Sequence, residues 1–253
     1  MKDILRPAVV ILSVLATIFF NFLANALPLN GLNTGQISDR FQVYFVPAGY
    51  VFSIWGLIYL GLIAYAIYQA LPAQRQNPRL RDTAYLIAGS GLANIAWLFF
   101  WHYEQFPLTL LAMLILLALL IATYLRLGIG RVSVAAGEKW SVQVPFSIYL
   151  GWITVATVAN VTDVLDYLRW DGFGLADEVW MLIILAAVFV IASLVSLTRR
   201  DIAYILVILW ALVGIAVKHS AVALVSSASL ATAALLVIVL LYSLFAKPRL
   251  AAS

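Results

Sequence analysis

Long apolar runs alternate along the whole chain with short stretches that hold most of the charged residues. A helix needs about 20 apolar residues to cross the hydrocarbon core of a bilayer. With the charges as boundaries, the pattern predicts eight spans, at 7–27, 47–70, 83–102, 107–126, 140–162, 178–198, 202–218 and 220–245. The seventh span is short and relies on Lys218 reaching up to the interface, so the last two could instead form a re-entrant pair. We expect an all-α fold, a polytopic membrane helical bundle of about eight transmembrane helices.

Prolines and small residues indicate where these helices begin and how they pack. Seven of the eight prolines, Pro28 and Pro248 among them, lie at or beyond the end of a predicted span, where a missing N–H costs least. Pro145 lies inside the fifth span and should bend that helix or free a carbonyl near its start. The run Gly89-Ser90-Gly91 should mark a close crossing between two helices.

The positive residues predict the orientation of the bundle. With the amino terminus inside, twelve lie in internal segments and only Arg40, Arg169 and Lys218 in external ones. The internal set is Lys2, Arg6, Arg75, Arg79, Arg81, Arg126, Arg131, Lys139, Arg199, Arg200, Lys247 and Arg249. The positive-inside rule then places both termini on the cytoplasmic side of the membrane. We expect this membrane to be a bacterial-type plasma membrane. The first span begins like a signal peptide, but its apolar run of about 20 residues is longer than a signal sequence usually has, so we expect it to be retained.

Composition supports the membrane assignment and excludes several kinds of site. The 253 residues are 65% hydrophobic and 10% charged, whereas a soluble domain carries roughly 25% charged residues. A formal net charge of +4 could suggest nucleic acid in a soluble protein. Here the cations collect at alternate helix ends, so we expect a lipid bilayer as partner and no nucleic acid. The absence of cysteine excludes disulfides, zinc thiolates and iron–sulfur clusters.

The loop at about 28–46 is the most distinctive connection. Its first part is rich in turn residues, whereas Phe41, Val43 and Phe45 alternate with polar or amphipathic neighbours. Such a segment could lie across the external mouth of the bundle as a lid. The alternative is an ordinary connector.

Uncharged polar and aromatic residues form stripes on three of the predicted helices. The stripes are Phe52, Trp55 and Tyr59; Asn94, Trp97 and Trp101; and Tyr149, Trp152, Ala156 and Asn160. In each stripe the helical spacing places the side chains on one face. Three inward-facing stripes would enclose a flat-sided pocket. From periodicity alone, helix–helix packing with interhelical amide hydrogen bonds is the simpler interpretation.

These same residues resemble the TspO/MBR family, the tryptophan-rich sensory proteins related to the mitochondrial translocator protein, or peripheral benzodiazepine receptor. The run from Pro47 to Trp55, followed by Tyr59, is similar to the family's second-helix signature P-P-x-W-x-F-x-x-x-W-x-x-x-Y/F. Asn94-x-x-Trp97 resembles the third-helix N-x-x-W/F. The run from Tyr149 to Asn160 resembles the fifth-helix Y-L-x-W-x-S-x-A-T-x-x-N.

The match has departures that limit what it implies. Ala48 replaces a proline, Tyr50 replaces a tryptophan, the fifth-helix proline falls upstream at Pro145, and the third helix lacks the usual W-S. The family normally has five helices, so the resemblance covers about residues 1–165. We expect 1–165 to be a TspO-like five-helix membrane core and 166–253 to be an additional three-helix membrane segment.

The resemblance implies a membrane receptor, sensor or carrier that binds a planar hydrophobic ligand, such as porphyrin or haem, in an aromatic intramembrane pocket. It makes Trp55 and Trp152 stacking residues, Asn94 a hydrogen-bonding residue and Ala156 a small residue that allows close approach. The candidate ligand-binding residues are Trp55, Tyr59, Asn94, Trp97, Trp152, Ala156, Tyr50 and Asn160. No cofactor is expected to be required. Family members are commonly dimers, so the resemblance also implies a homodimer, although no motif specifies its interface.

The polar residues of the chain do not form a pattern that favours catalysis or a metal site. No Ser/His/Asp set, paired carboxylates or phosphate loop is visible within the spans. His102 and His219 lie at external helix ends, and with Glu104 they would form a metal site only if the fold brought them together. Two other functions stay open: a small-molecule transporter of another class that uses the last three helices, and a non-catalytic membrane assembly protein whose stripes bind partner helices.

Overall fold

The structure is a computed structural model that describes residues 2–27 and 29–246. Within these ranges the chain forms helices and connecting loops, with no strand. The long helices are α1 (Lys2–Ala26), α3 (Ile54–Ala70), α4 (Pro78–His102), α5 (Phe106–Arg126), α7 (Val144–Tyr167), α8 (Asp177–Arg199), α9 (Ile202–Lys218) and α10 (Ala223–Phe245). The short elements are η1 (Leu29–Gly31), α2 (Thr34–Ser38), η2 (Gly49–Ser53), η3 (Pro72–Gln74), α6 (Ala136–Glu138), the π-helical turn η4 (Lys139–Gln143) and η5 (Gly172–Gly174).

The predicted all-α membrane bundle is confirmed. Each of the eight predicted spans coincides with one long helix, and seven of the described helices are long and apolar enough to cross a membrane. The remaining one, α9, has 17 residues and is short, as the sequence predicts. The fifth span is longer than predicted, because a continuous helical segment runs from Ala136 to Tyr167. Pro28, Lys247, Pro248 and Arg249 lie outside the described residues.

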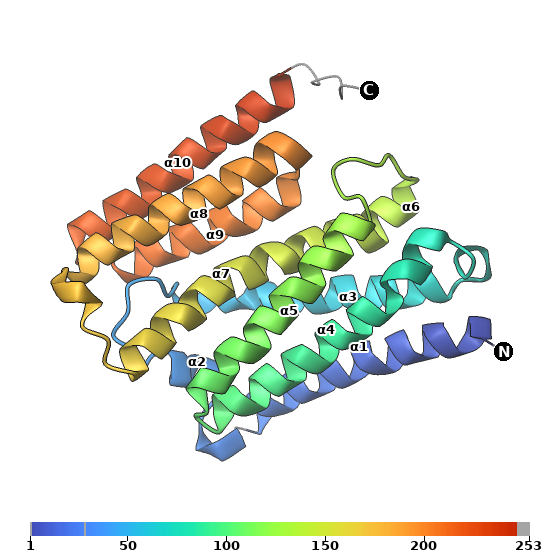
Figure 1. Ribbon diagram of the computed structural model, residues 1–253, viewed down its shortest axis with the longest axis horizontal. Coiled ribbons are helices and arrows are strands. Elements are labelled where there is room, and N and C mark those ends of the chain that lie inside the picture. Colours follow the sequence, from blue (N-terminus) through green and yellow to red (C-terminus); the bar gives the residue numbers. More distant parts are fainter. Residues whose placement is uncertain (1, 28, 247–253) are drawn as a thin grey trace.

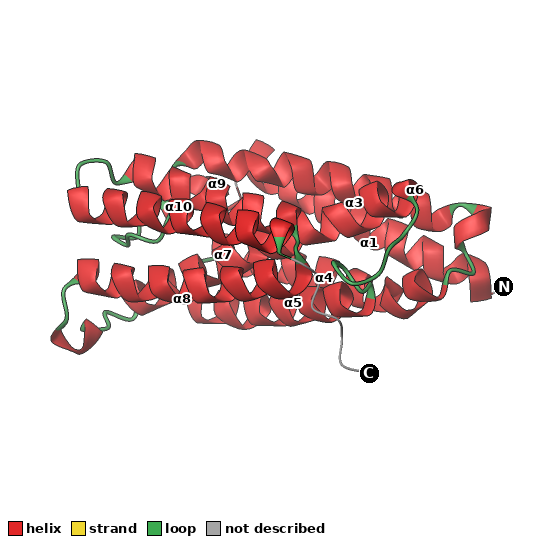
Figure 2. Cartoon of the chain, turned by 90° about the horizontal axis from the view of Figure 1, so that it is seen from above, coloured by secondary structure: helices red, strands yellow, loops and turns green. Residues whose placement is uncertain are grey.

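Helix α7 is the central element of the bundle. It packs against α3 and α5 on one side and against α9 on the other, while α1 and α4 extend the first group and α8 and α10 the second. Both views show the long helices running side by side in broadly one direction (Figures 1 and 2). The last three helices therefore lie against the helix that completes the first five.

Close helix approach occurs where the sequence places small residues. A Cβ on Gly91 would lie 2.3 Å from the Ser13 Oγ of α1, so the crossing predicted at Gly89-Ser90-Gly91 is confirmed at Gly91. Gly214 of α9 is packed as tightly, because its Cβ would lie 2.2 Å from Val51. At both positions the missing glycine side chain makes room for a side chain of the neighbouring segment, so the two segments pack closely.

Pro145 is the second residue of α7, and α7 follows directly on the π-helical turn η4. A proline donates no backbone hydrogen bond, and a π turn is one way in which a helix accommodates a local irregularity. A Cβ on Gly61 of α3 would lie only 2.9 Å from the Pro145 Cβ. The start of α7 is irregular, as Pro145 predicts, and α3 packs closely against it.

The basic segments gather at one end of the bundle. There the Arg6 guanidinium donates to the Arg75 carbonyl, and Arg79 pairs with Glu138 at 2.8 Å. Contacts at the opposite end join other loops, for example Lys218 to Asp39 at 2.9 Å. This separation agrees with the charge bias of the sequence. Which side of a membrane the basic end faces stays a prediction.

Candidate functional site: an aromatic cavity between helices

The three aromatic stripes come together around one small cavity. Its volume is about 50 Å³, and most of its wall is supplied by α3, α4 and α7. The lining residues are Thr34, Ser38, Val46, Pro47, Phe52, Trp55, Trp97, Trp101, Met113, Trp152, Val155, Ala156, Ala159, Asn160 and Asp163. Five of the eight candidate ligand-binding residues thus face a common space.

The aromatic rings around the cavity pack against one another. Trp97 and Trp101 are stacked, with ring centroids 5.4 Å apart and an interplanar angle of 20°. Trp152 meets Phe52 edge to face at 5.7 Å and Trp55 at 6.3 Å. Such pairs contribute about 0.5–1.5 kcal/mol each beyond the area that they bury. The closed arrangement leaves room for one or two water molecules of about 30 Å³ each, whereas ligand pockets usually measure about 300–1,000 Å³.

Asparagines hold the helices around the cavity. The Asn160 amide donates to the Thr109 hydroxyl of α5 at 2.9 Å, and its oxygen accepts from the Trp97 indole of α4 at 3.3 Å. The Asn94 oxygen accepts from Asn21 of α1 at 2.7 Å, and Asn94 does not line the cavity. The packing interpretation therefore holds for both asparagines, and for Asn160 it coexists with a place in the cavity wall.

Two polar groups in the cavity wall have no hydrogen-bond partner. They are the Trp152 indole N–H and the Asp163 Oδ1, and both side chains are buried, with exposed fractions of 2% and 3%. A buried polar group without a partner is costly, so each such group in a native protein calls for an explanation. A bound ligand that accepts a hydrogen bond from the Trp152 indole and donates one to the Asp163 carboxylate would explain both groups.

The structure corrects the end of the fifth predicted span, because a span that ends at 162 would leave Asp163 in an external loop. Helix α7 continues to Tyr167, so Asp163 lies on the helix and faces the cavity. The signal was present in the spacing, because Trp152, Ala156, Asn160 and Asp163 follow one another at intervals of four, four and three residues. Treating every charge as a span boundary concealed it.

Two other candidate residues lie outside the cavity. The Tyr59 ring stacks on Trp55 with centroids 5.7 Å apart, so it supports a lining residue without lining the space itself. Tyr50 is 46% exposed and meets the Trp210 ring edge to face at 5.3 Å. The fold brings Tyr50 toward α9 rather than toward the other stripes.

A segment from the loop between α1 and α3 covers one end of the cavity. Thr34 and Ser38 of α2, together with Val46 and Pro47, form part of its wall. The Trp101 indole donates to the Thr34 carbonyl at 3.2 Å, which fastens α2 to α4. Residues 34–47 thus lie across the mouth of the bundle, where the sequence analysis allowed a lid; we call them the covering segment.

Two titratable side chains of this end, Tyr44 and His219, are held in their uncharged forms. The Tyr44 hydroxyl donates to Glu178 at 2.9 Å, and this hydrogen bond raises the pKa of Tyr44 above its usual 10.0. His219 packs edge to face on Tyr44, with ring centroids 5.3 Å apart. Burial, and then the neighbouring Lys218 charge, lower the pKa of His219 below its usual 6.5. At neutral pH the covering segment therefore meets a neutral imidazole.

The possible metal ligands do not meet. The His102 ring contacts Thr34 and the Leu29 carbonyl, Glu104 pairs with Arg40, and His219 lies against Tyr44. Within residues 2–27 and 29–246, no group of three or more His, Asp or Glu side chains is placed to hold a metal ion.

The structure has two further cavities that the sequence analysis missed. One of about 910 Å³ lies between α3, α7 and α9, and one of about 250 Å³ lies between residues 42–45, α7 and α8. The eight tryptophans divide among these three cavities: Trp55, Trp97, Trp101 and Trp152 line the aromatic cavity, Trp140 and Trp210 the cavity of about 910 Å³, and Trp170 and Trp180 the third. Helical spacing did not reveal the two additional cavities, because loops and distant helices supply their walls.

The fold defines an integral, multi-pass α-helical membrane protein. The family model described as TSPO-like protein matches residues 7–242, and the chain belongs to this family. This match is typical of membrane proteins of the sensor or transporter type. No curated protein and no solved structure matches the chain. The family match extends through α8, α9 and α10, well beyond the region of about 1–165 in which we noted motifs. The division into a five-helix core and a three-helix segment stays a prediction.

Proposed function

We propose that the protein is a membrane receptor or carrier that binds a planar hydrophobic ligand of the tetrapyrrole kind in the aromatic cavity. The observation that supports this proposal is the meeting of four tryptophans around one space that also contains an unpartnered N–H and an unpartnered carboxylate oxygen. Indole faces stack on flat conjugated rings, and a few polar groups fix the orientation of such a ligand.

Binding requires the cavity to widen, because about 50 Å³ is too small for a tetrapyrrole. The covering segment is the part that can move at low cost. Its ion pairs, Asp39 with Lys218 and Arg40 with Glu104, are partly exposed to solvent. Exposed pairs of this kind contribute about 0–1 kcal/mol each. The stacked pair of Trp97 and Trp101 would then part and exchange ring–ring contacts for ring–ligand contacts.

The polar groups match the chemistry of a tetrapyrrole. Its central N–H groups are donors for the Asp163 carboxylate, and its carboxylate substituents are acceptors for the Trp152 indole N–H. A purely hydrocarbon ligand would leave both groups unpartnered. The proposal therefore favours a planar ligand that carries both a donor and an acceptor.

Tryptophan fluorescence of the purified full-length protein, titrated with protoporphyrin, tests the proposal. We expect saturable quenching by the wild type. Binding should be about tenfold weaker in Trp152→Phe, because this variant loses the indole N–H, and a hydrogen bond to a charged acceptor contributes about 1.5–3 kcal/mol. Trp180 lines the third cavity, so Trp180→Phe is the matched control and should bind protoporphyrin as the wild type does. Absence of saturable quenching, or equal loss in both variants, would remove the proposed site.

Receptor and carrier are distinguished by a second measurement. Counterflow of labelled protoporphyrin in proteoliposomes reports whether the bound ligand crosses the bilayer. Counterflow that disappears in Trp152→Phe identifies a carrier, whereas binding without counterflow identifies a receptor.

A further inference from the structure

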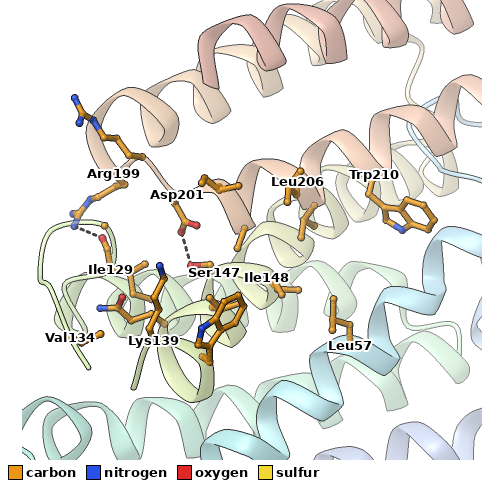
Figure 3. A pocket seen from close by; sticks show the side chains of 18 of the residues that line it. Leu57, Ile129, Val134, Lys139, Ser147, Ile148, Arg199, Asp201, Leu206 and Trp210 are labelled. Carbon is orange, nitrogen blue, oxygen red and sulfur yellow. Dashed lines mark hydrogen bonds between the residues drawn. The ribbon is translucent and has the colours of Figure 1, made fainter. Parts of the chain in front are cut away.

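An apolar groove lies between α3, α7 and α9. It measures about 910 Å³ and shares no lining residue with the aromatic cavity. Leu57 of α3, Ile148 of α7, and Leu206 and Trp210 of α9 form its apolar part (Figure 3). Leu57 and Leu206 are 53% and 55% exposed, so the groove opens to the side of the bundle. In a membrane-spanning protein this side faces lipid.

One end of the groove is positively charged. Lys139, Arg199 and Arg200 line it together with a single carboxylate, that of Asp201. Figure 3 shows Lys139, Arg199 and Asp201 at one end and Trp210 at the other. A ligand that fills the groove along its length would therefore have one charged and one apolar end.

The Asp201 carboxylate is already satisfied by the protein. Its Oδ2 accepts from the Ser147 hydroxyl at 2.6 Å and from the Tyr124 hydroxyl at 2.9 Å. Its Oδ1 accepts from the Tyr204 backbone N–H at 3.1 Å and so caps α9. These bonds use three of about four acceptor sites of the carboxylate. Among the described residues, Asp201 forms no ion pair with the cations beside it, so their N–H donors stay directed at the groove.

The cations, in contrast, keep donors available. Among the described residues Lys139 forms no ion pair or side-chain hydrogen bond. Arg199 donates to the Ile129 carbonyl at 3.3 Å and lies 5.7 Å from the centroid of the Tyr124 ring. Because a guanidinium carries five N–H donors, most of those of Arg199 are left for an anion.

The dimensions fit one leaflet of a bilayer. From Ile202 to Trp210, α9 rises by about 12 Å. Half of a hydrocarbon core is about 15 Å thick. An acyl chain whose headgroup lies at the basic end would thus extend along α9 toward the bilayer midplane, and it would enter the groove sideways from the membrane.

We propose that this groove binds one anionic phospholipid. The headgroup phosphate lies at Lys139 and Arg199, and an acyl chain lies along Leu57, Ile148 and Leu206 toward Trp210. Basic pockets between transmembrane helices recognise anionic headgroups through charge and hydrogen bonds. The lipid contacts α3, α7 and α9 together, so it joins the last three helices to the first five.

Native mass spectrometry of the full-length protein, purified in detergent and incubated with phosphatidylglycerol or phosphatidylcholine, tests this proposal. We expect one retained phosphatidylglycerol per chain, preferred over phosphatidylcholine about tenfold or more, because each basic residue near a headgroup adds to the attraction. Lys139→Gln and Arg199→Gln should each reduce this preference. Arg126→Gln is the matched control: Arg126 is exposed at the same end but does not line the groove.

Leu206→Trp tests the apolar part independently of charge. The larger side chain should occupy the groove and abolish retention of both phospholipids, while protoporphyrin quenching at the aromatic cavity stays as in the wild type. That quenching shows that the variant is folded, and it separates failure of this proposal from failure of the proposed function. Three results would overturn the phospholipid assignment. The first is equal retention of the two phospholipids, and the second is a loss of preference in Arg126→Gln equal to that in Lys139→Gln. The third is retention of oleate, added as a single-chain anionic lipid, when phosphatidylglycerol is not retained.

Discussion

At the scale of single residues, two buried aspartates are in opposite situations. Asp201 receives three hydrogen bonds from α5, α7 and its own helix. Asp163 has an oxygen without any partner, and its side chain faces the aromatic cavity. Since removing a satisfied acceptor costs stability and removing an unsatisfied one does not, Asp201 acts in the fold, and Asp163 is the better candidate for ligand binding.

We expect Asp163→Asn to stabilise the protein while weakening ligand binding. A neutral amide is less costly to bury than a carboxylate, so the free energy of unfolding should rise by about 1 kcal/mol and the thermal-unfolding midpoint should increase. Protoporphyrin affinity should fall, because the acceptor for the ligand N–H is weakened. Thermal unfolding and fluorescence titration measure the two effects.

The control for this prediction is Asp201→Asn, which should lower the free energy of unfolding by about 1–3 kcal/mol because three donors lose a charged acceptor. If Asp163→Asn destabilised the protein as much as Asp201→Asn does, Asp163 would be a structural residue.

At the scale of helices, the sequence predicts where each helix lies along the chain better than it predicts the residues at which the helix begins and ends. Every long helix follows an apolar run, because a bilayer leaves no other partner for backbone N–H and C=O groups than the helix itself. The ends of the helical segment Ala136–Tyr167, which contains η4 and α7, were misplaced because Lys139 and Asp163 were taken as boundaries. A helix can carry a buried carboxylate where it lines a cavity, and a lysine where it reaches a groove. Only the neighbouring helices reveal such places.

Helix crossings are expected to depend on single glycines. We predict that Gly91→Ala lowers the free energy of unfolding by about 1–3 kcal/mol, because overpacking forces α1 and α4 apart. Its Cβ would lie 2.3 Å from the Ser13 Oγ and 2.7 Å from the Thr17 Oγ1. The Ser13 hydrogen bond to the Ala88 carbonyl, at 2.9 Å, would be disturbed as well.

Gly89→Ala, two residues earlier on the same helix, is the matched control. Its Cβ would meet the Leu119 Cδ1 at 3.4 Å, an ordinary contact, so stability should change little. Unfolding of both variants in a graded series of denaturing detergent measures the difference. Equal stability of the two variants would contradict the role of Gly91 in the crossing.

At the scale of the whole molecule, the last three helices are continuous with the rest. The Ala48 N–H donates to the Gly214 carbonyl at 3.1 Å, and the Trp210 indole donates to the Val51 carbonyl at 3.1 Å. Both bonds join α9 to the segment that leads into α3. Helix α9 also supplies part of the wall of the groove between α3, α7 and α9, and the family match reaches residue 242.

The predicted orientation can be measured directly, because the chain contains no cysteine. We expect Ala176→Cys to react with a membrane-impermeant maleimide in intact cells and Ala73→Cys to react only after permeabilisation. Both positions are exposed: Ala176 lies in the loop before α8, and Ala73 lies in η3 between α3 and α4. These two connections are at opposite ends of the bundle (Figure 1). The reverse pattern would contradict the assignment of the basic end to the cytoplasm.

The sequence by itself determined that this chain is a bundle of membrane helices, since the thickness of a bilayer converts directly into the length of an apolar run. It also placed five residues of the aromatic cavity, because helical spacing aligns Trp152, Ala156 and Asn160 on one face. Only the tertiary structure decided how much space the rings leave and which polar groups lack partners. It alone revealed the groove between α3, α7 and α9. These properties depend on contacts between segments such as Val51 and Trp210, far apart in the chain, for which no local pattern exists.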